Sequence, residues 1–504
     1  MALESKNFEV VKKEKISGVH SIECNIEGLN GCSKVLAITG GTDIENTEVS
    51  DGKINITGAL ELCAVYISEE DEICTTSMNF PFNYELKDEK VTPDCKDMLS
   101  ARLVKQNIKS ATSTDIKVEC EISFDGFIVC PISIATVKNE DRDYSSKEDE
   151  IKVIKLIGRN CSKLLEEVKG TVKNGVKKIL CTKTNVLLKN TEAGVDFVSI
   201  SGEIETEITY VNADDRFESL MLSDTFKDEV ELSGVTRDSI VEAKVSLICS
   251  ESKIITSEEE KTTSFVVTLP LKACVCAYSE ESVEVIKDIY STKCELSVNT
   301  SSFDMLKSVK HDEFESKLSG GLTLSENDDR IDKILFALAG TLEITNCYQD
   351  GKEIFLEGIA NACVVYLNDD TNSIKSVEIS TPFVVSDKAQ DVAGDSIITY
   401  DVSLCDVDVS VKKGREISLD AKIKGQISYN ENEISAVISE VSEGEKYPER
   451  DYAMELFFAK SGQSSWDIAK SAKVKEENVI FQNPELVFPL EKDEQILLYF
   501  QKLS

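Results

Sequence analysis

The sequence predicts a mainly β protein, with three tandem β-sandwich-like repeat units followed by a small α+β domain of βααβ order. Two observations predict this fold class: one sequence pattern recurs three times, and apolar residues alternate with polar residues inside each copy. Alternation with a period of two is typical of strands that bury one face. The expected boundaries are 1–143, 144–297 and 298–447 for the β units and 452–504 for the final domain.

The repeated pattern opens with Lys, an aliphatic residue and Leu, and later places Gly eight residues before Tyr. The openings begin at Lys34, Lys178 and Lys333. The Gly and Tyr pairs are Gly58 with Tyr66, Gly202 with Tyr210, and Gly358 with Tyr366. The spacing from Leu to Gly is 22, 22 and 23 residues, so the copies keep nearly the same register. We expect the copies to fold alike.

Each Gly of these pairs lies on the face that the alternation predicts to be buried. In the first copy this face also holds Ile54, Ile56, Leu60 and Leu62. A Gly on such a face permits a bend, a bulge or close packing. A Gly cradle for phosphate is the alternative, but it needs a following helix N-terminus, which the pattern does not predict. A short helix is a candidate over residues 162–170, where a strand is the alternative.

An acidic turn follows the Tyr of each copy, at residues 68–72, 212–216 and 368–371. Clustered carboxylates raise the question of Ca²⁺, yet calcium loops need more ligands and a Gly at a fixed offset. Solvated hairpin turns, which Asp and Asn favour, explain the pattern better. We expect no metal site and no cofactor.

Composition excludes several classes of function. The chain carries 56 Lys and Arg against 92 Asp and Glu, a formal net charge of −36, which repels nucleic acids and anionic lipid surfaces. No apolar run is long enough for a membrane span, and the N-terminus lacks the apolar core of a signal peptide. We therefore expect a cytosolic protein whose sixteen cysteines are free and mostly buried thiols.

No enzymatic site is recognisable in the sequence. The chain has two histidines, His20 and His311, and it lacks a nucleophile elbow, a Walker loop and a metal-ligand triad. Pairs of carboxylates carry no information in so acidic a chain. The expectation is a protein that is not an enzyme.

The repeated units resemble the SPOCS domain, a spore-coat-associated domain of clostridial spore-forming bacteria. The resemblance rests on the Lys-aliphatic-Leu opening, the Gly-to-Tyr strand, the acidic turn and a Pro-Phe pair at positions 81–82 and 382–383. It covers most of residues 5–445 and is strongest in the third copy. The second copy lacks the Pro-Phe pair.

Residues 452–504 resemble a LysM domain, a βααβ module. A strand at 456–459 leads into a Ser-Gly turn, a first helix follows, a second helix runs near 475–482, and a final strand lies at 496–500. Ser464 or Ser465 is expected to cap the first helix. The usual Asp-Thr after the Gly and the usual Pro-Gly before the last strand are replaced by other residues.

Trp466 is the only Trp of the chain and lies at the start of the first helix. It either covers the small core between helix and sheet or edges a groove between the two strand-helix loops. The structural role is favoured, because a module of this size has a small hydrophobic core and depends on each large side chain buried in it. Both roles are compatible, since aromatic residues also dominate interface energetics.

This domain order resembles the SipL-like family of spore-morphogenesis proteins. The resemblance implies a non-enzymatic adaptor of endospore coat assembly in the mother-cell cytoplasm, recruited to the forespore surface. Its implied partner is a SpoIVA-like ATPase of the coat basement layer, bound through the LysM domain. The alternative is a spore-envelope protein that binds peptidoglycan or N-acetylglucosamine through LysM. The implied contact residues are Lys460, Ser461, Gly462, Gln463, Ser464, Trp466, Asn483, Pro484, Glu485 and Leu486.

Overall fold

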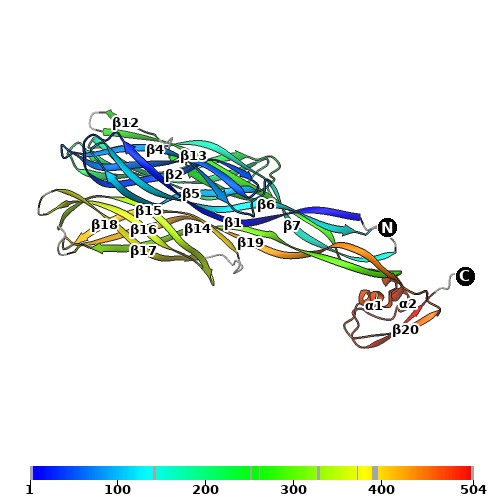
Figure 1. Ribbon diagram of the computed structural model, residues 1–504. Coiled ribbons are helices and arrows are strands. Elements are labelled where there is room, and N and C mark those ends of the chain that lie inside the picture. The colour runs from blue at the N-terminus through cyan, green and yellow to red at the C-terminus, as the bar shows by residue number, and fades with distance from the viewer. Residues whose placement is uncertain are drawn as a thin grey trace.

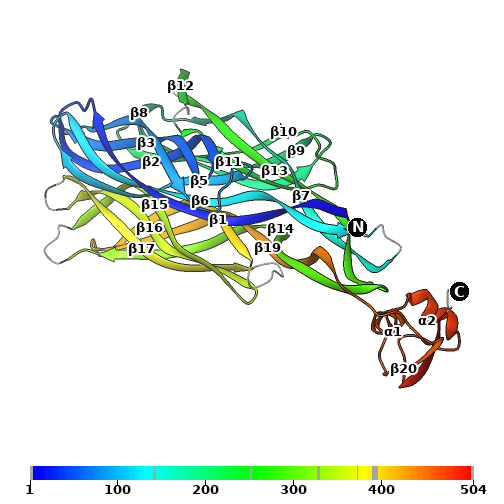
Figure 2. The same ribbon diagram turned by 45° about the vertical axis from the view of Figure 1, so that its right-hand side comes forward.

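A computed structural model describes most of the chain and shows a mainly β fold (Figure 1). The described residues are 4–139, 143–249, 253–259, 262–325, 330–369, 371, 373–388 and 396–500. Long twisted strands form an elongated body, and the C-terminal segment is a small lobe at one end in both views (Figures 1 and 2). Asp370, in the third acidic turn, lies outside the described residues. Within the described ranges, no helix has the length and apolar character needed to cross a membrane.

The first repeat folds into two antiparallel sheets that pack face to face. The strands are β1 Glu4–Glu27, β2 Cys32–Ser50, β3 Lys53–Ser68, β4 Ile73–Lys87, β5 Lys96–Ala111 and β6 Asp115–Lys138. β2, β3 and β4 form a meander, whereas β6 pairs with both β1 and β5. A shared core contains Ile122 and Phe124 from one sheet and Ile56 and Leu62 from the other. The predicted sandwich character of this repeat is therefore confirmed.

The second and third repeats follow the same connectivity, except that the second has an additional strand, Lys253–Glu259, which pairs with its last strand. The second contains β7 Tyr144–Val172, β8 Val176–Ala193, β9 Phe197–Asn212, β10 Phe217–Glu231, β11 Ile240–Leu247, β12 Lys253–Glu259 and β13 Thr262–Ser291. The third contains β14 Cys294–Thr323, β15 Ile331–Asp350, β16 Glu353–Asn368, β17 Ile374–Lys388, β18 Ile397–Lys412 and β19 Glu416–Lys446. In each repeat the first long strand pairs with the last, as β7 does with β13 and β14 with β19.

Residues 162–170, for which a helix was one expectation, lie in the strand β7. Leu164 and Val168 are buried in the core of the second repeat. The spacing of four between these two residues suits a helix face as well as a strand face, so the local pattern was ambiguous. Pairing with β13 along the whole segment decides in favour of the strand.

The repeat glycines sit where two strands approach unusually closely. Gly58 pairs with Ile44, directly beside a register shift in β2. A Cβ atom on Gly58 would lie 2.1 Å from the carbonyl oxygen of Asp43 and 2.6 Å from the ring of Phe82. In the other copies, a Cβ at Gly202 or Gly358 would lie 2.2 or 2.0 Å from a backbone oxygen. The prediction that these glycines permit a bulge and close packing is confirmed.

The aromatic partner of this glycine is present in all three copies. Phe82 is the cross-strand neighbour of Gly58, and Phe383 is that of Gly358. In the second copy Phe226 faces Gly202 in the same way. The second copy therefore lacks the Pro of the Pro-Phe pair but keeps the ring that covers the glycine.

The three repeats meet around a buried lysine. Lys13 of β1 donates from Nζ to a carboxylate oxygen of Glu242 at 2.6 Å and to Oδ1 of Asn430 at 2.8 Å, and all three residues are buried. These partners come from the second and third repeats. The hydroxyl of Tyr278 also donates to Glu242. Burial lowers the pKa of Lys13, while the charge of Glu242 acts in the opposite direction.

The expectation that all cysteines are free is wrong. Cys95 is bonded to Cys130, and Cys161 to Cys274, in the described part of the chain. Cys161 and Cys274 are direct cross-strand partners in β7 and β13, which places their Cα atoms 4.0 Å apart. Strand register creates both pairings, and register could not be read from the spacing of cysteines along the sequence. The remaining cysteines are free and are buried or half-buried.

Replacing Gly58 with Ala is expected to destabilise the first repeat. The new methyl group overlaps a backbone oxygen that cannot move without breaking the bulge, so we expect a loss of about 2 kcal/mol or more. A urea unfolding midpoint measures the effect. Gly158→Ala is the matched control, because its Cβ meets only a flexible Leu232 methyl at 3.3 Å. Equal midpoints for both variants would contradict this assignment of the glycine.

Thiol titration tests the cysteine pairing. In denaturant without reductant, protein purified in air should show twelve reactive thiols, which are the free cysteines of the structure. After reduction the count should rise to the sixteen of the sequence. Cys161→Ser should leave Cys274 reactive and Cys95 protected. A count of sixteen before reduction would exclude both disulfides.

Candidate functional site

The C-terminal lobe is built from a strand, two helices and a second strand, in the described residues 452–500. These elements are β20 Met454–Ala459, α1 Ser465–Ala472, α2 Glu476–Gln482 and β21 Glu494–Tyr499. β20 and β21 pair antiparallel. The helices cover one face of this small sheet through a core that contains Ile468, Ala469, Val479, Ile496 and Leu498.

The start of α1 is fixed by local hydrogen bonds. Ser464 is the N-cap, and its hydroxyl accepts a hydrogen bond from the backbone N–H of Asp467. The carboxylate of Asp467 accepts in return from the backbone N–H of Ser464 at 2.9 Å. The hydroxyl of Ser464 also donates to this carboxylate at 2.7 Å, and this bond, followed by the backbone one, lowers the pKa of Asp467. Of the two expected caps, Ser464 is the one used.

The first predicted contact loop is tied to the segment before β21. The N–H of Gly462 donates to the carbonyl of Leu490 at 2.7 Å, and the N–H of Ser461 to the carboxylate of Asp493 at 2.9 Å. The side-chain oxygen of Gln463 accepts from the N–H of Lys460 at 2.8 Å. Several polar groups of this loop thus form hydrogen bonds within the lobe. These bonds hold the loop in shape and leave fewer of its donors and acceptors for a binding partner.

The second predicted loop has a structural residue at its start. Asn483 is buried, and its side-chain amide donates to the carbonyls of Val479 and Leu497 at 3.0 and 3.1 Å. Asn483 therefore links the end of α2 to β21. Pro484 and Glu485 are exposed, and Leu486 is half-buried. A role of either loop in partner contact stays a prediction.

Trp466 faces β13 of the second repeat. Its side chain is 8% exposed, its indole N–H donates to the carboxylate of Asp288 at 2.8 Å, and its ring meets that of Tyr290 edge-on at 4.9 Å between centroids. The hydroxyl of Tyr290 donates to the carbonyl of Val474 at 2.8 Å. Lys470 also donates to Asp288. The tryptophan thus anchors the module to β13.

Asp288 is held in its charged form by this contact. Burial alone would raise the pKa of its carboxyl group, but the hydrogen bonds from Lys470 and Trp466 outweigh burial and lower it. Neither Asp288 nor Tyr290 was predicted as a site residue. They lie far from Trp466 in sequence, on a strand whose alternation indicates only a buried face, so no local pattern predicts this contact.

The outer face of the small sheet is apolar and uncovered. Met454, Leu456 and Phe458 alternate along β20 with residues that face the module core. Tyr499 pairs with Met454 across the sheet and is also exposed. Phe458 is 68% exposed. We call these four residues the outer apolar face.

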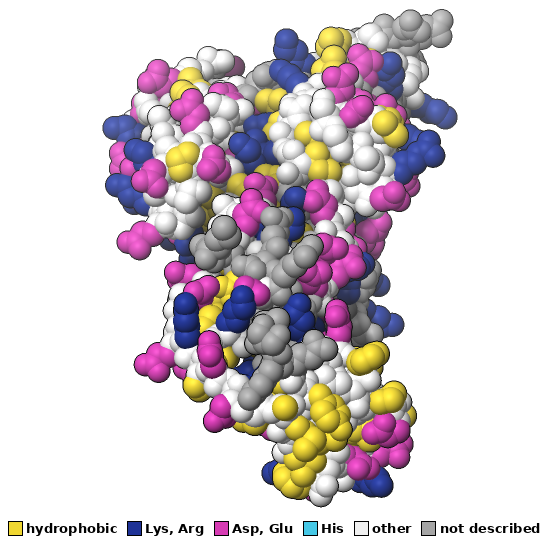
Figure 3. Space-filling view, turned by 90° about the vertical axis from the view of Figure 1, so that its right-hand side faces the viewer, with side chains coloured by type: hydrophobic (Ala, Val, Ile, Leu, Met, Phe, Trp, Pro, Cys, Tyr) yellow, Lys and Arg dark blue, Asp and Glu magenta, His cyan; other side chains and the backbone are white. Residues whose placement is uncertain are grey.

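The rest of the lobe adds to this apolar character. Exposed large apolar side chains are also found at Tyr452, Ile480, Phe481 and Val487. The space-filling view shows apolar side chains gathered at the lower end of the molecule, over the C-terminal lobe (Figure 3). Contiguous exposed apolar surface on a protein marks an interaction site. The lobe is therefore the candidate functional site of the chain.

Asp288→Ala is expected to loosen the lobe from β13. A hydrogen bond to a charged group contributes about 1.5–3 kcal/mol, and the variant also removes the partner of Lys470. Trp466 should then become more exposed, and its fluorescence emission should move to longer wavelength in native buffer. Glu284→Ala, on the same strand and exposed, is the control. An unchanged emission in Asp288→Ala would show that this contact does not hold the lobe in solution.

Comparison with known protein families finds one match, which lies in the repeats. A family model described as SipL, SPOCS domain, matches residues 32–122 and 175–255. The matched segments begin at or just before β2 and β8 and lie in the first and second repeats, whereas we expected the resemblance to be strongest in the third. No curated protein and no solved structure matches the chain. Residues 32–122 and 175–255 are therefore similar to the SPOCS domain of SipL, and this match supports a SipL-like, sporulation-related protein.

Proposed function

We propose that this protein is a non-enzymatic adaptor of endospore coat assembly. Its C-terminal lobe, which resembles a LysM domain, binds a SpoIVA-like ATPase of the coat basement layer. The adaptor acts in the mother-cell cytoplasm and is recruited with its partner to the forespore surface. The repeats form the body that carries the lobe.

The observation that supports this function best is the outer apolar face of β20 and β21. Met454, Leu456, Phe458 and Tyr499 offer large side chains and few hydrogen-bonding groups. Protein interfaces are built around such buried aromatic and aliphatic anchors. Sugar recognition instead needs several convergent polar groups. The face therefore favours a protein partner over a glycan.

Charge also favours the lobe as the contact module. Residues 452–504 contain six Lys and eight Asp or Glu, so their formal charge is −2, against −36 for the whole chain. Most of the negative charge lies in the repeats. An acidic partner is repelled least by the lobe.

The two histidines occupy packing positions, which supports a role without catalysis. His20 stacks near Tyr84 with ring centroids 5.2 Å apart, and burial lowers its pKa. His311 shares a hydrogen bond of 2.8 Å between Nδ1 and Ser428, and burial lowers its pKa as well. Both environments favour the neutral imidazole.

Substitutions on the outer apolar face are expected to weaken partner binding. Leu456→Ser and Phe458→Ser should each weaken pull-down of the SpoIVA-like ATPase by tenfold or more, since a truncated anchor costs about 2 kcal/mol. Val384→Ser, an exposed apolar residue of β17, is the matched control. Circular dichroism and Trp emission should stay unchanged, because both side chains are already exposed.

The same pull-down distinguishes the outer apolar face from the two predicted contact loops as the binding surface. Gln463→Ala and Leu486→Ala probe the predicted loops, and a deletion of residues 452–504 removes both surfaces. Full binding by the deletion variant would exclude the lobe as the contact module and assign the interaction to the repeats. Titration with N-acetylglucosamine oligomers, read by Trp fluorescence, tests the alternative glycan ligand.

A further inference from the structure

A cavity of about 160 Å³ lies where the three repeats meet. Residues of β2 and β5 line it from the first repeat, β7, β11 and β13 from the second, and β18 from the third. Its volume corresponds to about five water molecules at the density of the liquid. No ligand was predicted for this region of the chain.

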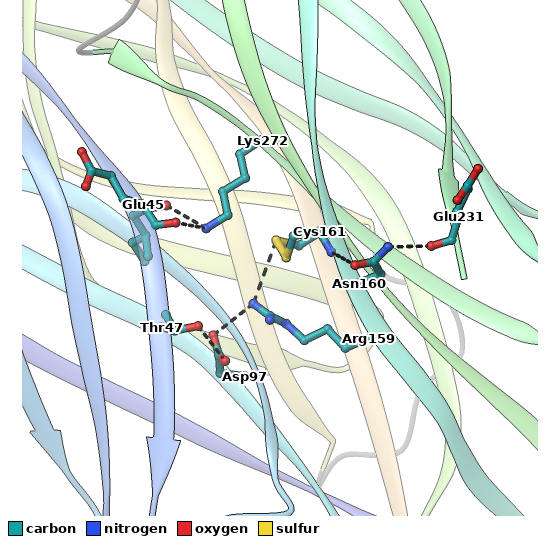
Figure 4. Close-up of a disulfide and its surroundings, with 10 residues drawn as sticks. Glu45, Thr47, Asp97, Arg159, Asn160, Cys161, Glu231 and Lys272 are labelled. Carbon is teal, nitrogen blue, oxygen red and sulfur yellow. Dashed lines mark hydrogen bonds and ion pairs between the residues drawn. A yellow bond between two sulfur atoms is a disulfide. The ribbon is translucent and has the colours of Figure 1, made fainter. Parts of the chain in front are cut away.

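Four cationic side chains line this cavity: Arg102, Arg159, Lys244 and Lys272. Their contacts with carboxylates are long: Arg159 lies 3.3 Å from Asp97, and Lys244 lies 3.8 Å from Asp401. Lys272 donates to the backbone carbonyls of Ile44 and Glu45 (Figure 4). Arg102 donates to the carbonyl of Tyr400 at 3.4 Å.

The carboxylates around the cavity do not outnumber these cations. Asp43, Asp97 and Asp401 line it, so the lining has an excess of one positive charge in a chain whose formal charge is −36. Asp97 also accepts from Thr47 at 2.9 Å, which engages part of its hydrogen-bonding capacity (Figure 4). The surplus of cations is local, and the four side chains are half-buried, where charge is screened less than at the open surface.

Four buried polar atoms that line the cavity have no protein partner within the described residues. They are Oγ1 of Thr42, Oγ of Ser100, Nη1 of Arg102 and Nε of Arg159. Each of them can donate a hydrogen bond. Buried donors in native proteins are nearly always satisfied, by protein, water or ligand. Water or a bound ligand in the cavity would supply acceptors for these donors.

The cations also repel one another. Burial lowers the pKa of Lys244, and Arg102 acts in the same direction, whereas Asp401 and other nearby carboxylates partly oppose them. Burial and then Arg159 lower the pKa of Lys272, again against nearby carboxylates. A negatively charged occupant relieves both effects at once, whereas water relieves only the missing hydrogen bonds.

We propose that this cavity binds a small oxyanion with tetrahedral oxygens, such as phosphate or sulfate, held by donors of the first and second repeats where these meet the third. Such an ion accepts several hydrogen bonds in divergent directions, which matches donors that arrive from β2, β5 and β7. Because its ligands come from different repeats, the bound ion stabilises their arrangement. This site is independent of the C-terminal lobe and of the partner proposed for it.

Inorganic phosphate is the probe for the test. At equal ionic strength, phosphate and sulfate should raise the melting temperature of the full-length protein more than chloride does, because a ligand of the native state stabilises it by mass action. Titration calorimetry gives the phosphate affinity. Identical melting in the three salts would mean that the cavity holds water only, and would overturn the proposal.

Two variants locate the ion. Lys244→Met should weaken phosphate binding by about tenfold or more, since it removes a charged contact. Thr42→Val removes a hydroxyl that has no protein partner, so it should lower phosphate affinity about fivefold without lowering stability in chloride. Lys169→Met, an exposed lysine of β7, is the control. Wild-type affinity in both cavity variants would place the ion elsewhere and would also overturn the proposal.

Discussion

The arrangement of the repeats depends on one buried charge. Lys13 is fully buried, and its ammonium group is satisfied only when Glu242 and Asn430 are both in place. Removing one member of such a pair leaves an uncompensated buried charge, which costs about 3–5 kcal/mol. Since each of the three residues belongs to a different repeat, we infer that this contact specifies how the repeats dock. An apolar core alone, such as the Leu36, Leu180 and Phe336 cluster, tolerates more than one arrangement.

The repeats and the C-terminal lobe differ in how much apolar side chain they leave exposed. The repeats place apolar side chains inward and charge outward, and their connections close each sandwich. The lobe is too small to bury all its apolar residues, and its sheet is apolar on both faces. Ile496 and Leu498 fill one face, and Phe458 stands on the other. The contact of Trp466 with Asp288 joins the lobe to β13 and leaves this second face exposed to solvent.

The repeats could be predicted from the sequence because their signals are local. The period of two, the Gly-to-Tyr spacing and the cap at Ser464 each lie within a few neighbouring residues. The contacts that were missed join distant segments. The bond between Cys161 and Cys274 follows from the register of β7 against β13, and the contact of Trp466 with Asp288 from the docking of the lobe. Even the apolar outer face of β20 was missed, because Leu456 and Phe458 have the composition of a buried strand.

Pairing of first and last strands has a consequence for how the protein is made. β1 ends at Glu27, but its partner β6 begins only at Asp115. During synthesis at about 5–20 residues per second, β1 leaves the ribosome seconds before its partner exists. Such non-local pairing is slow and leaves a strand edge open to other chains. Lys13 points inward from β1, and an inward-pointing charge disfavours pairing with a wrong strand. The lysine that joins the three repeats in the folded protein therefore also disfavours wrong strand pairing before the first repeat is complete.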